Sequence, residues 1–85
     1  MITTIEIFTK TDCSKCTKLT DFLNKMGVQF VKRNIDVDPE AETDARMLNI
    51  LGAPALRKGN KLLRVKDIFF KEQIIEDKIK SFVQN

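Results

Sequence analysis

Apolar and polar positions along the chain change their spacing repeatedly, which predicts that strands and helices alternate. Residues 4–8, Thr-Ile-Glu-Ile-Phe, are rich in β-branched and aromatic side chains and predict a first strand. Between residues 13 and 26 the apolar side chains recur at helical spacing. They are Leu19, Phe22, Leu23 and Met26. Gly27 follows where a helix commonly closes in a left-handed conformation, so a helix over about residues 13–26 is expected.

The middle of the chain predicts a second strand followed by a second helix. Residues 28–35 are the strand. Asp38-Pro39-Glu40 is typical of a helix start, because Asp38 can accept from free backbone amides and proline suits the first helical position. Its apolar face comprises Ala41, Ala45 and Leu48. We expect Gly52 to close this helix.

The last third predicts a hairpin and a final helix. Residues 54–58 and 61–65 flank Gly59-Asn60, a dipeptide suited to a tight turn between antiparallel strands. Apolar side chains at helical spacing then predict a helix over about residues 71–83. The order is β-α-β-α-β-β-α. Because a helix joins the first two strands, they should be parallel, giving one α/β domain, residues 1–85, with a mixed four-stranded sheet between helices.

Composition narrows the classes of function. The 85 residues carry 15 Lys and Arg against 12 Asp and Glu, and there is no Trp or Tyr to stack on bases. This mixed charge does not favour nucleic-acid binding. No apolar run approaches the length of a membrane span, and the first residues lack the pattern of a secretory signal. We therefore expect a monomer in the cytoplasm, bound to neither nucleic acid nor membrane.

Two cysteines carry the candidate chemistry. Cys13-Ser14-Lys15-Cys16 falls where the first strand has ended and the first helix begins. Free backbone amides and the positive end of the helix dipole stabilise a thiolate there, and Lys10, Lys15 and Lys18 add positive charge. Cys13, at the tip, is the expected nucleophile. Cys16, one turn further, is the expected resolving thiol of a dithiol–disulfide exchange.

The cysteine pair alone leaves a second class of function open. Two cysteines at this spacing also occur in zinc and iron–sulfur sites. The chain has no His and no third Cys, so a single copy cannot complete a tetrahedral Cys/His site. A metal or iron–sulfur centre shared across a dimer is the alternative interpretation, with no metal expected in the single chain.

Residues 5–16, a strand followed by Lys10 and then the cysteine pair, resemble the start of glutaredoxins and glutaredoxin-like proteins. Leu51-Gly52-Ala53-Pro54 resembles the second signature of that family, a cis proline that opens the third strand. The resemblance implies a thioredoxin fold. It also implies that Pro54 packs beside the cysteines, that the backbone of Ala53 pairs with a substrate chain, and that Lys10 is a substrate-binding residue.

Several residues of this chain differ from the glutaredoxin pattern, and these differences bear on which molecule supplies its electrons. Ser14 and Lys15 replace the Pro-Tyr of classical glutaredoxins. The Gly-Gly pair that holds glutathione is missing from Leu63-Arg64-Val65-Lys66-Asp67, although Asp67 could match the acid that follows it. The chain is more similar to glutaredoxin-like proteins that act as thioredoxins, including electron donors of ribonucleotide reductases. This implies reduction of protein disulfides, a thioredoxin reductase-like electron source rather than glutathione, and no cofactor beyond the Cys13–Cys16 disulfide.

Overall fold

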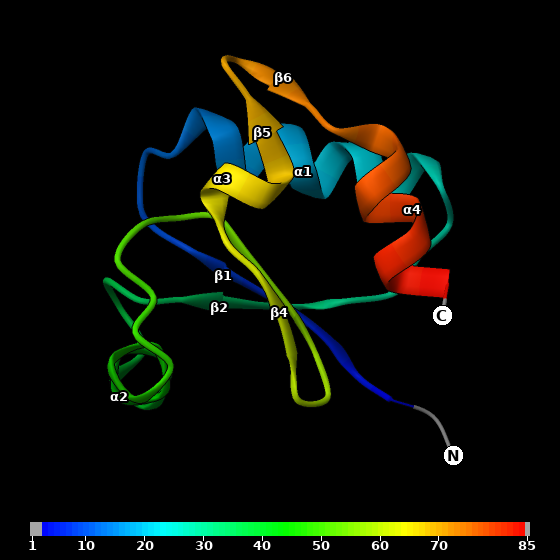
Figure 1. Ribbon diagram of the computed structural model, residues 1–85. Helices are drawn as coiled ribbons and strands as arrows, with labels where there is room; N and C mark the ends of the chain where they lie inside the picture. The colour runs from blue at the N-terminus through cyan, green and yellow to red at the C-terminus, as the bar shows by residue number, and fades with distance from the viewer. Residues whose placement is uncertain (1–2, 85) are drawn as a thin grey trace.

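The computed structural model describes residues 3–84, and its elements alternate as the sequence predicts up to the hairpin (Figure 1). The elements are β1 (Ile5–Thr9), α1 (Ser14–Lys25), β2 (Val31–Asn34), α2 (Pro39–Met47), β3 (Ala55–Lys58), β4 (Lys61–Leu63), α3 (Val65–Ile68), β5 (Phe69–Phe70), β6 (Gln73–Ile74) and α4 (Glu76–Gln84). Among these residues no helix has the length and apolar character needed to cross a membrane.

Four strands form one mixed sheet in the order β2-β1-β3-β4. β1 pairs in parallel with β2 and antiparallel with β3, while β3 and β4 form an antiparallel hairpin. Gly59, with φ +62°, makes the hairpin turn, where a residue without Cβ is favoured. The predicted α/β fold, with parallel first strands and a mixed four-stranded sheet, is confirmed.

Helices cover both faces of the sheet, as Figure 1 shows, with α1 and α4 on one side and α2 on the other. Alternate residues of β1 point to opposite faces, so Ile7 packs with Leu19 of α1 and Ile79 of α4 in the larger core. Phe8 packs on the other face with Ala45 of α2. Ile7 and Phe8 are fully buried, which makes β1 the central element of the three layers.

The first two helices end with the same arrangement of hydrogen bonds. After α1, Gly27 has φ +74° and Val28 N–H donates to the carbonyl of Leu23, as the sequence predicts. After α2 the left-handed residue is Asn49, with φ +56°, and Ile50 N–H donates to the carbonyl of Ala45. The prediction that Gly52 closes α2 is wrong, because asparagine also tolerates this conformation and stands closer to the last helical turn.

The prediction of one helix over residues 71–83 is wrong at its start. A single turn of helix, α3, is followed by a two-stranded hairpin in which Phe69 pairs with Ile74, and α4 begins only at Glu76. Lys71 has φ +57° and makes the turn. Phe69 is buried whereas Phe70 is exposed. Aromatic and β-branched residues favour the paired strands here, and their spacing also matched a helix, which explains the error.

Arg33 of β2 joins two elements on the α2 side of the sheet. Its guanidinium lies 3.0 Å from a carboxylate oxygen of Glu6 on β1 and 2.6 Å from one of Asp44 on α2. It also lies 5.3 Å from the centre of the Phe8 ring. The hydrogen bond with Asp44, aided by Glu6, raises the pKa of Arg33 against the opposing effect of burial, so the cation persists wherever the fold does.

We predict that Arg33→Met lowers the free energy of unfolding by about 2 kcal/mol, because two carboxylates then lose a partly buried partner. The matched control is Arg46→Met, which removes an exposed arginine paired with Glu42 within α2 and should cost less than about 0.5 kcal/mol. Urea denaturation followed by circular dichroism measures both. Equal destabilisation by the two variants would contradict this account of Arg33.

Candidate functional site

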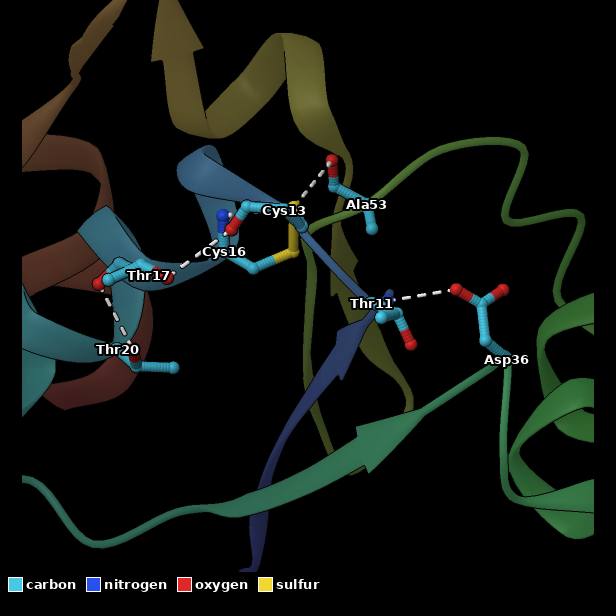
Figure 2. The surroundings of a disulfide bond; sticks show 7 residues. All are labelled: Thr11, Cys13, Cys16, Thr17, Thr20, Asp36 and Ala53. Carbon is cyan, nitrogen blue, oxygen red and sulfur yellow. Dashed lines mark hydrogen bonds between the residues drawn. A yellow bond between two sulfur atoms is a disulfide. The ribbon is translucent and has the colours of Figure 1, made fainter.

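Cys13 and Cys16 form a disulfide at the N-terminus of α1, with 5.2 Å between their Cα atoms (Figure 2). Cys13 is the N-cap residue, and its Sγ accepts a hydrogen bond of 3.1 Å from Cys16 N–H. This bond would strengthen if the sulfur carried a negative charge, since a charged acceptor binds an amide more strongly than a neutral one. Cys13 is half-buried, whereas Cys16 is 5% exposed. Only the first sulfur is open to a partner.

The loop from β1 to α1 is held from the neighbouring strand. Thr11 N–H donates to the carboxylate of Asp36, 2.8 Å away in the loop after β2, as Figure 2 shows. Asp12 has φ +55° and turns the chain into the helix. Cys13 itself occupies the N-cap position of α1. The first turn is further held by Thr17, whose hydroxyl donates to the Cys13 carbonyl.

A second loop, residues 49–54, faces the disulfide. The Ala53–Pro54 peptide bond is cis, as the resemblance to glutaredoxins implies, and Pro54 is fully buried at the entry to β3. The carbonyl oxygen of Ala53 lies 4.0 Å from Cys13 Sγ (Figure 2). A backbone carbonyl of this loop therefore lies next to the sulfur of Cys13.

The five residues predicted for the site come together. Lys10, Cys13 and Cys16 line one hollow of about 350 Å³, on the side of β1 and β2. Ala53 lies with its carbonyl oxygen close to Cys13 Sγ and precedes Pro54. Lys10 is exposed and makes no ion pair within residues 3–84. A reactive sulfur, a backbone edge and an unpaired cation thus share one face.

Comparison with known proteins agrees with this geometry. The glutaredoxin family model matches residues 5–63, from β1 through the end of β4. The chain belongs to the glutaredoxin family. No curated protein sequence matches the chain. The fold, the family and the paired cysteines are those of a thiol–disulfide oxidoreductase.

Several solved structures share this glutaredoxin fold. The thioredoxin-like protein BC3987 superposes with a TM-score of 0.73 at 17% identity, covering 91% of this chain and 96% of that one. Glutaredoxin grx-1 from Archaeoglobus fulgidus gives 0.69 at 21% identity, covering 99% and 89%. The glutaredoxin-like protein NrdH-redoxin from Escherichia coli gives 0.64 at 27% identity, covering 71% and 79%.

Sequence reasoning missed how Arg64 holds the loop before Pro54. Its guanidinium donates to the carbonyl of Leu48, 2.8 Å away, and to the carbonyl of Asn49. These are carbonyls at the end of α2 that lack helical partners, so Arg64 ties α2 to the start of α3. Val65 packs beside this loop, since a Cβ on Gly52 would lie 3.6 Å from Val65 Cγ2. The only sequence signal was the absence of the family's Gly-Gly pair from residues 63–67.

The alternative interpretation is a metal centre, and the described residues offer no group of ligands for one. In the described part of the chain no three Cys, His, Asp or Glu side chains cluster in an arrangement that could hold a metal ion. A centre shared between two copies would need both cysteines reduced and released from the disulfide that they form here. The arrangement of one partly accessible and one buried sulfur is instead suited to sequential attack.

We predict that, in the reduced protein, a brief exposure to iodoacetamide alkylates Cys13 at least roughly tenfold faster than Cys16, because the thiolate must be both formed and accessible. Peptide mass spectrometry after quenching measures the two sites separately. In denaturant the two cysteines should react at similar rates, which serves as the control. Equal labelling of the folded protein would contradict the roles assigned to the two sulfurs.

Proposed function

We propose that this glutaredoxin-family chain reduces protein disulfides by a dithiol mechanism. The single observation that carries the proposal is the asymmetry of the pair: Cys13 is open at the tip of α1 and Cys16 is buried within bonding reach. A partly accessible sulfur at a helix N-terminus is suited to attack, and a buried neighbour is suited to resolve the product.

The first step forms a mixed disulfide. The thiolate of Cys13 attacks one sulfur of the partner's disulfide, and the S–S bond of the partner breaks as the new bond forms. The departing partner thiolate takes a proton from solvent. Cys16 N–H and the helix dipole stabilise the thiolate of Cys13 before the attack.

The second step releases the partner. Cys16 loses its proton to solvent and its sulfur attacks Cys13 Sγ, which breaks the mixed disulfide and frees the second partner thiolate. The internal Cys13–Cys16 disulfide remains, which is the state seen here. Two electrons have passed to the partner. An external dithiol reductant must then return two electrons before another turnover.

The backbone around Pro54 supports a role in holding the partner. A segment in extended conformation can pair with the backbone of Ala53, as a strand adds to a sheet edge, which brings its cysteine toward Cys13. Buried Pro54 positions that edge. Lys10, on the other side of the disulfide, supplies a positive charge for the partner or for the thiolate.

Arg64 and Val65 favour a reductase over glutathione as the electron source. They lie in the segment, residues 63–67, from which the family's glutathione-holding glycines are missing, and their side chains pack against the loop before Pro54. NrdH-redoxin, a structural neighbour, is described as a glutaredoxin-like protein with a thioredoxin-like activity profile. We propose a thioredoxin reductase-like donor and, as acceptors, enzymes such as ribonucleotide reductases that need their disulfides reduced, in a reducing cytoplasm.

We predict that Cys13→Ser abolishes reduction of a protein disulfide, whereas Cys16→Ser retains the first step and accumulates a mixed disulfide with the substrate. Intact mass spectrometry of the trapped complex and an insulin-reduction assay measure the two effects. Full activity of the Cys13→Ser variant would exclude this mechanism.

We predict that titration in glutathione buffers, with free thiols trapped and masses measured, gives a reversible two-electron change at a potential between about −180 and −270 mV. A persistent glutathione adduct on Cys13 would favour glutathione as the donor. If no internal disulfide forms at any ratio, the dithiol mechanism is wrong, and metal analysis of anaerobically purified protein then tests the shared metal centre.

A further inference from the structure

A second hollow, of about 580 Å³, lies beside the disulfide between the first turn of α1, the loop before Pro54 and the start of α3. Three cations, Lys15, Arg64 and Lys66, and the apolar residues Ile50, Leu51 and Val65 are among its lining residues. Ala53 also lines it, so the hollow adjoins the backbone edge next to Cys13. When a substrate cysteine is bound to Cys13, the substrate residues on either side of it would extend into this hollow.

The three cations that line this hollow differ in the contacts that they already make within the protein. The guanidinium of Arg64 already donates hydrogen bonds to the carbonyls at the end of α2. Lys15 lies 5.6 Å from the centre of the Phe69 ring, and Lys66 is exposed with no ion pair or hydrogen bond to its ammonium within residues 3–84. Asp67 does not offset them, because its carboxylate accepts from Arg64 N–H and lies 3.9 Å from Lys78. Two ammonium groups therefore remain for a ligand.

Positive charge is concentrated on this face of the molecule. The two hollows beside the disulfide are lined by five cations, Lys10, Lys15, Lys32, Arg64 and Lys66, and by one carboxylate, Asp12. The other ten Lys and Arg of the chain are outnumbered by eleven Asp and Glu. The net charge of +3 is thus carried by the redox face, and such a field attracts acidic partners.

An exposed apolar side chain accompanies this charge. Leu51 is 93% exposed at the rim of the hollow, although a leucine gains free energy when it leaves water. An acidic segment of a protein partner that carried an apolar residue could cover Leu51 and pair with Lys15 and Lys66 together.

We propose that this hollow selects protein substrates in which Asp or Glu residues flank the attacked cysteine. The inference rests on the proposed function and adds a substrate class to it. Lys15 and Lys66 are specificity-determining residues, acting on the flanking carboxylates rather than on the sulfur that reacts.

Three disulfide-linked peptides of equal length, with acidic, neutral or basic residues around the cysteine, test this proposal. At low ionic strength the wild-type protein should reduce the acidic peptide with a kcat/KM about fivefold above that for the basic one, a preference that high salt weakens. The variant Lys15→Glu/Lys66→Glu should abolish or reverse this ratio. The ratio is the readout because a substitution beside Cys13 can also change the reactivity of the thiolate.

The matched control is Lys25→Glu/Lys80→Glu, which makes the same change in net charge at the far end of α1 and on α4. It should retain the preference for the acidic peptide. A wild-type ratio near one, or equal loss of the preference in both double variants, would overturn the proposal. Reduction of the uncharged 2-hydroxyethyl disulfide is measured in parallel. Its persistence alongside a lost preference would leave the dithiol function standing, while its absence in the wild type would overturn both.

Discussion

The structure depends on the short connection between a largely buried strand, β1, and the N-terminal end of α1. β1 is paired on both sides and covered on both faces, so the position of Thr9 is set by the whole sheet. Four residues later Cys13 caps α1, and the helical turn then sets where Cys16 lies. The core therefore sets where both cysteines lie, which keeps a partly accessible sulfur in a defined place.

Backbone groups form most of the surroundings of the disulfide. The chain has no histidine that could act as a base near Cys13. The amide of Cys16, the carbonyl of Ala53 and the end of α1 lie close to its sulfur instead. The Cys16 amide and the positive end of α1 stabilise negative charge on the sulfur without a proton-transfer partner, whereas the carbonyl oxygen of Ala53 does not. Asp36 and Arg64 act at a distance from the sulfur, through the loops that they hold.

The sequence predicted those features that depend on strong local preferences. β1, α1 with Gly27, the Gly59 turn and the Asp38 cap all follow from residue type and spacing. The errors arise where two residues could each end the same helix, or where the spacing of apolar residues fits both a helix and a strand. Asn49 ends α2 although Gly52 was available, and the turn at Lys71 uses a residue that rarely adopts positive φ. The contacts of Arg64 could not be predicted, because they join segments about 15 residues apart through backbone carbonyls.

Arg64 and Val65 also connect the stability of the site to the choice of its partner. In the segment that lacks the family's glycine pair, the chain has one side chain that ties the loop before Pro54 to α2 and another that packs against Gly52. A cradle for the backbone of a small peptide requires close approach, which glycine permits and these side chains oppose. The same side chains add a cation and apolar surface at the hollow beside Ala53. In the function proposed above, a partner with a longer acidic segment uses both, while the same side chains oppose the binding of glutathione.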